Sequence, residues 1–345
     1  MEGQPQDVDL VFEGGGVKGV GLAGALAVLE ERGYRPRNVA GSSAGAITAA
    51  LLAAGYTADE LREIVFALDL RRFRDKAWED KVPFVDRPLS VLLDLGVYEG
   101  TAFLEWLRAL LAARGVSTFA DLRGPGLQVL ASDVTRRELL VLPRDADKLG
   151  VDAGTLEVAT AVRMSMSIPI FFEPVRFRNP RTGREHLIVD GGMLSNFPVW
   201  LFDCEGAPSR PTFGLLLVEP RPRVSIGARL PMDPMPEHGP RALVAYLQAL
   251  AQTVMEAHDR LYVESADFAR TIAIPTLGIG STEFDLSYER KLALYDSGRR
   301  AAGSFLETWS FEAYVAEFRS GKRRSRRLGL VRQQREAVER EAAER

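Results

Sequence analysis

Cysteine is almost absent from this chain. A single thiol, Cys204, occurs in 345 residues, so an intrachain disulfide is excluded. The acidic neighbours Asp203 and Glu205 oppose ionisation of that thiol, which makes it a poor candidate for a nucleophile. So few cysteines favour a reducing compartment.

Long hydrophobic runs are also missing. The first ten residues, "MEGQPQDVDL", lack the basic and apolar stretches of a secretory signal, and no apolar run approaches the roughly 20 residues that cross a bilayer. We therefore expect a soluble, cytoplasmic protein. Hydrophobic residues still make up 46% of the chain, enough to bury a large core in one big domain or two ordinary ones.

The net charge of −3 is small but unevenly distributed. Residues 319–345 carry ten Lys/Arg and four Asp/Glu, which leaves 34 against 43 in the first 318 residues. We expect an acidic domain over residues 1–310 and a basic tail over 311–345. The tail suits either a solvated segment or attraction to an anionic membrane. Nucleic-acid binding is not expected, because no aromatic residues interleave the arginines.

Apolar runs of strand length alternate with helical patterns along most of the chain. This alternation predicts an α/β fold, a three-layer sandwich around a mainly parallel sheet. The expected strands are Val8–Glu13, Asn38–Gly41, Leu127–Asp133, Glu138–Leu142, His186–Asp190, Phe213–Glu219 and Thr271–Ile274, and the expected helices are Val20–Gly33, Ala46–Gly55, Thr57–Leu68, Thr101–Gly115, Thr155–Met166, Arg241–Phe268 and Leu286–Trp309.

Two segments do not follow the alternation. Residues 71–100 mix charges with aromatics without a period, so we interpret them as an insertion or a cover, in which aromatics such as Trp78 and Phe84 belong to the core or meet a membrane. Residues 219–240 are rich in proline, which breaks both helices and sheet ladders, and are expected to form a long loop.

Five glycines surround one lysine in "FEGGGVKGVG", directly after the first expected strand. Gly14, Gly16 and Gly19 fit the G-x-G-x-x-G pattern of dinucleotide-binding folds, but the second strand runs into "AGSSAG" and lacks the acidic residue that holds the ribose. A phosphate loop of the Walker type is disfavoured, because Lys18 is followed by glycine and valine. Two interpretations remain open, namely a tight turn and a set of backbone N–H groups that stabilise an oxyanion.

The second strand ends in "GSSAG", which fits the G-x-S-x-G pattern of a sharp strand-to-helix turn. Such a turn exposes the side chain of its central residue, so Ser43 is the candidate nucleophile. Ser42 precedes the central position of this pattern by one residue, and it suits a helix-capping role.

A nucleophilic serine needs a base, and the three histidines have poor contexts for this role. His186 lies within an expected strand, His238 in the proline-rich segment, and His258 on a charged helical stretch. The alternative base is Asp190, which ends the apolar run of "LIVDGG" beside two glycines. An Asp-Gly pair that only forms a turn is the competing interpretation.

At this point the chain resembles the patatin-like phospholipase family, through "GGGVKG", "GSSAG" and "DGG". A fourth stretch, "RMSMSIPIFFEP" at 163–174, is similar to the family's Ser-x-Ser-x-Pro segment, although a helix that ends at a proline explains it equally well. The likeness covers about residues 8–202.

The resemblance implies a Ser–Asp dyad of Ser43 and Asp190. It also implies a lipid acyl hydrolase of the phospholipase A or lysophospholipase type, acting on carboxylic esters at a membrane surface without metal or organic cofactor. The alternatives are a Ser-His-Asp esterase and a nucleotide-binding module. The oxyanion hole is assigned by the resemblance to Gly14, Gly15, Gly16, Lys18 and Gly19.

Overall fold

The computed structural model describes residues 6–69, 73, 95–219, 246–247, 249–250, 253–254, 265–281, 283 and 285–319. Most of the expected insertion, the proline-rich segment, the helix expected at 241–268 and the basic tail lie outside these ranges. Two compact units divide the chain, one of residues 1–202 and 210–309 and the other of residues 203–209 and 310–345.

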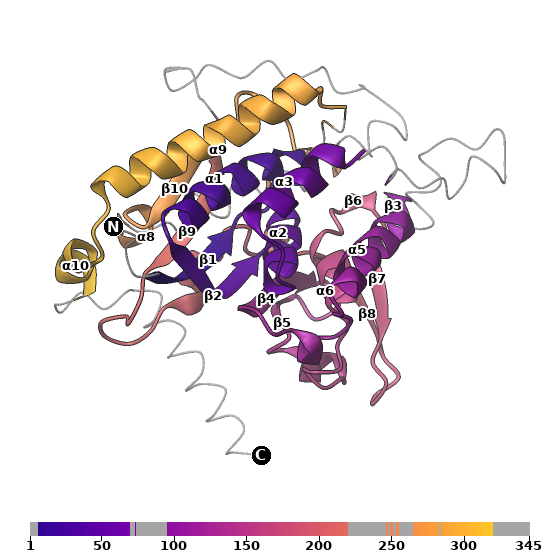
Figure 1. Ribbon diagram of the computed structural model, residues 1–345. Coiled ribbons are helices and arrows are strands. Elements are labelled where there is room, and N and C mark those ends of the chain that lie inside the picture. Colours follow the sequence, from indigo (N-terminus) through magenta and orange to yellow (C-terminus); the bar gives the residue numbers. More distant parts are fainter. Residues whose placement is uncertain are drawn as a thin grey trace. The chain divides into compact units, whose positions relative to one another are not determined.

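The larger unit is built on an eight-stranded sheet (Figure 1). Its order is β10-β9-β1-β2-β4-β8-β7, and β5 pairs with β4 beside this path. The neighbours from β10 to β4 are parallel, whereas β5, β8 and β7 run antiparallel to their partners. The strands are β1 Gln6–Phe12, β2 Tyr34–Gly41, β4 Gly126–Asp133, β5 Glu138–Leu142, β7 Val175–Arg178, β8 Glu185–Asp190, β9 Thr212–Val218 and β10 Thr271–Pro275.

Six of the seven expected helices are present with bounds within three residues of those predicted, whereas most of the seventh, 241–268, lies outside the described residues, and the helix at 311–314 was not predicted. Thr57 forms a capping box with Glu60 at the start of helix Ala58–Ala67. The predicted α/β class with a mainly parallel sheet is confirmed. The helices are α1 Val20–Glu31, α2 Ala44–Ala53, α3 Ala58–Ala67, α5 Thr101–Ala113, α6 Val158–Ser165, α8 Ser265–Phe268, α9 Tyr288–Thr308 and α10 Phe311–Tyr314, with short helical turns at η1 Gly16–Gly19, η3 Phe119–Asp121, η4 Ala146–Leu149, η5 Gly191–Met193, η6 Val199–Phe202 and η7 Val315–Arg319.

Three short strands were not predicted. Strands β3, Gly96–Tyr98, and β6, Ile170–Phe172, form a separate parallel pair. Each is only three residues long, too short to show a period. Strand β7 carries a readable signal, because Val175 and Phe177 alternate with two arginines.

Helices α1 and α9 pack side by side on one face of the sheet (Figure 1). Their backbones approach so closely that a Cβ on Gly24 would lie 2.0 Å from the carbonyl oxygen of Tyr295, and one on Gly298 would lie 1.9 Å from that of Gly21. Glycine is required at both positions because any side chain would force the helices apart.

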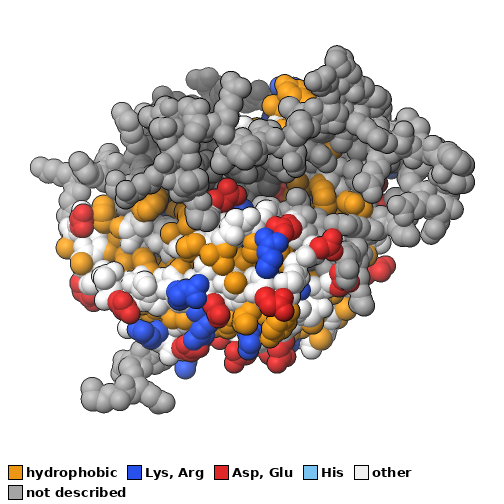
Figure 2. Space-filling view, turned by 90° about the horizontal axis from the view of Figure 1, so that it is seen from above, with side chains coloured by type: hydrophobic (Ala, Val, Ile, Leu, Met, Phe, Trp, Pro, Cys, Tyr) orange, Lys and Arg blue, Asp and Glu red, His pale blue; other side chains and the backbone are white. Residues whose placement is uncertain are grey.

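Strand β9 shows that both faces of the sheet are covered. Phe213 packs its ring against Phe305 and Trp309 on the α9 side. The next residue, Gly214, faces the other way, where a Cβ would meet Phe197 and Val199. The surface seen in Figure 2 mixes acidic, basic and apolar side chains over the described residues.

The smaller unit contains α10 and the π-helical turn η7 in its described part. Ser310 caps α10 by accepting the N–H of Ala313 at 3.2 Å, and Arg319 forms an ion pair of 2.7 Å with Asp203. Within the described ranges, every helix of the chain is too short or too polar to cross a bilayer.

Candidate active site

Ser43 sits in a strained turn between β2 and α2. Its backbone has φ +52° and ψ −125°, a region that residues with a side chain rarely adopt, and its side chain is buried. Gly41 and Gly45 make the turn possible, because a Cβ on Gly41 would lie 2.3 Å from the backbone of Gly45, and one on Gly45 would lie 2.3 Å from the carbonyl oxygen of Phe12. Residues 41–45 are called the elbow below.

The sheet register brings Asp190 to the level of the elbow. Gly41 of β2 pairs with Val129 of β4, and Asp190 of β8 pairs with Ala131, two residues further along β4. Gly191 then passes over β4 so closely that a Cβ would lie 2.3 Å from the carbonyl oxygen of Leu130. Two segments 147 residues apart in sequence therefore lie on the two sides of β4 at nearly the same level.

The carboxyl group of Asp190 is completely buried. One oxygen, Oδ1, accepts the N–H of Gly192 at 2.7 Å, and the other, Oδ2, has no hydrogen-bond partner in the described part of the chain. Burial raises the pKa of Asp190 to about 7, while the Gly192 N–H and the nearby Ser43 hydroxyl lower it. The hydroxyl of Ser43 is thus close to the carboxyl group without completing a normal hydrogen bond to Oδ2.

The glycine-rich loop, Gly14–Gly19, lies beside the elbow. A Cβ on Gly14 would come within 3.0 Å of Ser43 Cβ. The N–H of Gly14 donates to the carbonyl oxygen of Asn196, and that of Lys18 donates to Gly15. The N–H groups of Gly15 and Gly16 have no hydrogen-bond partner among the described residues, in a loop that adjoins Ser43 through Gly14.

Gly16 fixes the conformation of this loop. Its φ is +56°, and a Cβ would lie 2.0 Å from the carbonyl oxygen of Ser281. At Gly15 the crowding atom is Cδ1 of Leu217, the end of a flexible side chain. Lys18 is almost buried, with Nζ 3.9 Å from Glu219 Oε1. Gly19 is less crowded, since its nearest contact would be an ordinary 3.5 Å to Ala44 Cβ.

Two residues without a predicted role hold the loop against the segment after Asp190. Nδ2 of Asn196 donates to Glu13 Oε1 and to the carbonyl oxygen of Gly14, each at 3.2 Å, while Glu13 Oε2 accepts the N–H of Leu217 at 2.5 Å. Ser42 donates to the carbonyl oxygen of Ser195 at 2.7 Å. A charged residue at the end of an apolar strand is the signal that could have pointed to Glu13.

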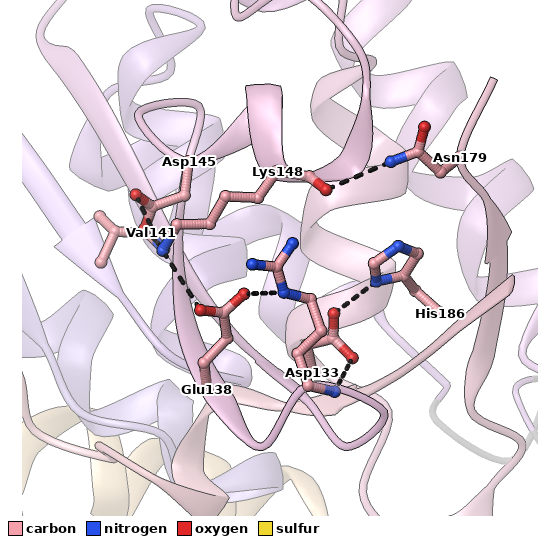
Figure 3. A network of polar contacts seen from close by, with 8 residues as sticks. Asp133, Glu138, Val141, Asp145, Lys148, Asn179 and His186 are labelled. Carbon is pink, nitrogen blue, oxygen red and sulfur yellow. Dashed lines mark hydrogen bonds and ion pairs between the residues drawn. The ribbon is translucent and has the colours of Figure 1, made fainter. Parts of the chain in front are cut away.

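His186 lies elsewhere. It precedes Asp190 by four residues on one strand, a separation of about 13 Å. Its Nδ1 is 2.6 Å from Asp133 Oδ2, and both residues are buried. Figure 3 shows this pair beside a network in which Lys148 lies 3.6 Å from Glu138. His186 is therefore not placed to accept a proton from Ser43, and His238 and His258 lie outside the described residues.

Metal-binding side chains do not gather in the described part of the chain. No group of three or more His, Cys, Asp or Glu residues there has an arrangement that could hold an ion.

Comparison with known proteins places this chain in a family. The model of patatin-like phospholipases matches residues 10–203. The uncharacterized protein YqhO of Bacillus subtilis (strain 168) is 39% identical over 304 residues, which cover 88% of this chain and 99% of YqhO. A probable lipid hydrolase, 463L of Invertebrate iridescent virus 6, is 26% identical over 204 residues, covering 55% of this chain and 61% of that protein.

A solved structure shares the fold. VipD from Legionella pneumophila superposes with a TM-score of 0.54 at 18% identity, over 89% of this chain and 67% of that one. At this identity the likeness concerns the fold alone. The family match spans the glycine-rich loop, the elbow and Asp190, and it covers more than half of the sequence. The chain belongs to the patatin-like phospholipase family.

Proposed function

We propose that this protein is a lipid acyl hydrolase that uses Ser43 as nucleophile and Asp190 as its only side-chain partner. The observation that carries the proposal is a strained serine close to a fully buried carboxyl group whose Oδ2 has no hydrogen-bond partner among the described residues. Strain and an unpaired buried oxygen both cost stability, so their coincidence favours a catalytic role.

The reaction would proceed in two steps. Ser43 Oγ attacks the ester carbonyl while its proton passes to Asp190, and the carbonyl oxygen becomes an oxyanion. Asp190 then returns the proton to the departing alcohol, which leaves an acyl group on Ser43. Water, deprotonated by Asp190, attacks this acyl group in the second step, and the fatty acid leaves as Ser43 regains its proton.

Gly15 and Gly16 would supply the oxyanion hole. Within the described part of the chain their N–H groups have no hydrogen-bond partner, whereas those of Gly14 and Lys18 donate to backbone carbonyl oxygens. A donor fixed in advance is typically worth about 10² to 10³ in kcat when its removal is measured. Such help is needed, because a carboxylate is a weak base for a hydroxyl group.

The substrate class follows from the family. Its members are phospholipases, and the viral relative is a probable lipid hydrolase. We therefore propose carboxylic esters of membrane lipids as substrates, cleaved by a phospholipase A or lysophospholipase reaction at a membrane surface. Incubation with a phospholipid panel, followed by mass spectrometry, should detect free fatty acid and the matching lyso or glycerophospho product. Release of phosphorylated headgroup instead would contradict the proposal.

Activity should depend on pH through Asp190. The carboxyl group must be ionised to accept a proton, and burial raises its pKa to about 7. We expect kcat/KM on a soluble ester to rise about tenfold per pH unit below about pH 6 and to level off above about pH 8. A pH–rate profile from 5 to 9 checks this, and constant activity down to pH 5 would show that another group is the base.

The two loop glycines should respond differently to alanine. At Gly16 a Cβ meets backbone and φ is positive, so Gly16→Ala should displace the free N–H groups and lower kcat about 10²- to 10³-fold. At Gly15 the Cβ meets a flexible leucine, so Gly15→Ala should cost about tenfold or less. Steady-state kinetics with circular dichroism tests this order, and equal activity of Gly16→Ala and the wild type would remove the loop from the mechanism.

A further inference from the structure

The last residue of α6, Ser165, contacts the elbow directly. Its side chain is completely buried, and its Oγ accepts the N–H of Ser43 at 3.0 Å. Ser43 is the N-cap residue of α2, and the N–H groups at the start of a helix have no partner within the helix. The hydroxyl of Ser165 thus satisfies a buried donor at the residue with the strained backbone.

The same short segment also holds Asp190. The carbonyl oxygen of Ser167 accepts the N–H of Asp190 at 2.9 Å. Only Met166 separates the two anchoring residues, and two residues of chain span at most about 7 Å. One short piece of backbone therefore contacts both Ser43 and Asp190.

This segment is itself firmly fixed. Arg163, one turn before Ser167, is buried, and it donates to the carbonyl oxygens of Gly100 at 3.2 Å and Glu173 at 3.0 Å. Ser167 Oγ donates to the carbonyl oxygen of Arg163 at 2.7 Å. The acceptor that Ser165 offers to Ser43 is therefore held in place by neighbouring elements.

We propose that Ser165 is a positioning residue for the nucleophile, which keeps Ser43 in its strained conformation facing Asp190. The inference rests on the proposed function, because it assigns to Ser165 an effect on the reactivity of Ser43. Without the Ser165 hydroxyl, the Ser43 N–H is buried without a hydrogen bond. A rotated elbow in which this N–H donates to another acceptor is then lower in free energy. Ser43 Oγ is then displaced from the carboxyl group of Asp190.

The test compares Ser165→Ala with Ser297→Ala. Ser297 is a matched control, since it is also a buried serine with one hydrogen bond to backbone, 2.7 Å to the carbonyl oxygen of Pro275, but it belongs to α9. We expect Ser165→Ala to lower kcat about 10- to 100-fold with KM changed less than about twofold. The rate of labelling of Ser43 by a fluorophosphonate should fall by a similar factor. Ser297→Ala should keep both rates.

Two further variants keep the test decisive if alanine disturbs folding. Ser165→Thr retains the hydroxyl and should recover most of kcat, and Ser165→Cys offers a weaker acceptor and should fall between serine and alanine. The proposal is overturned if Ser165→Ala matches Ser297→Ala in kcat and labelling rate, or if threonine is no better than cysteine. Failure of the proposed function is distinguished by Ser43→Ala, which would then remain active.

Discussion

Replacing Ser43 by alanine should reduce hydrolysis of a lipid ester at least about 10⁴-fold while the fold is retained. The variant removes only the oxygen that is proposed to attack the carbonyl, and the backbone donors of the loop cannot supply another nucleophile. Loss of one hydroxyl from a buried position leaves the contacts of Gly41 and Gly45 unchanged. Initial rates on a phospholipid and thermal unfolding, measured on one preparation, give both results.

Ser42→Ala is the matched control for this prediction. The two serines are adjacent in the elbow and both are buried, but the hydroxyl of Ser42 donates to the carbonyl oxygen of Ser195. We expect Ser42→Ala to lose this one hydrogen bond and to lower the rate about tenfold or less. If Ser42→Ala were inactive and Ser43→Ala active, the nucleophile would have to be reassigned.

Replacing Asp190 by asparagine should reduce kcat about 10³- to 10⁴-fold, because the amide has the same shape but cannot accept the proton of Ser43. The opposite effect is expected on stability. The pKa of Asp190 rises from 3.8 to about 7 on folding, so between these values the folded state binds a proton that the unfolded state has released. Stability therefore falls as pH rises through this window. Above pH 7 the Tm of Asp190→Asn should therefore be higher than that of the wild type.

The histidine variants decide between a dyad and a triad. His238→Ala and His258→Ala should each remain active, whereas Asp190→Asn should not. His186→Ala would test stability only, since that ring is paired with Asp133. An inactive histidine variant with an intact fold, together with an active Asp190→Asn, would favour a Ser-His-Asp esterase.

Local patterns identified the motifs of the site, but not how they meet. "GSSAG" and "DGG" both predict sharp turns after strands, and the structure has such turns at Ser43 and Asp190. Their proximity depends on β4, which pairs with β2 in parallel and with β8 in antiparallel orientation. Register and direction of strands far apart in sequence are set by tertiary packing, which a single sequence does not display.

The separate roles of the glycines are likewise not visible in the sequence alone. The sequence predicts one role for the whole loop Gly14–Gly19. In the structure the N–H groups of Gly14 and Lys18 donate to carbonyl oxygens, whereas those of Gly15 and Gly16 have no partner among the described residues. Gly21 and Gly24 follow in the same stretch of sequence, yet they serve the packing of α1 against α9. A glycine needed for a close backbone approach cannot be told apart from one needed for a turn until the neighbouring chain is placed.

Covalent labelling tests the central claim most directly, namely that Ser43 is the nucleophile and Asp190 its base. The full-length protein is treated with a fluorophosphonate, digested and mapped by mass spectrometry, with Asp190→Asn treated in parallel. The account predicts one adduct, on Ser43, formed at least about 100-fold more slowly in Asp190→Asn. An adduct on another residue, or labelling of Ser43 at an unchanged rate in Asp190→Asn, would contradict it.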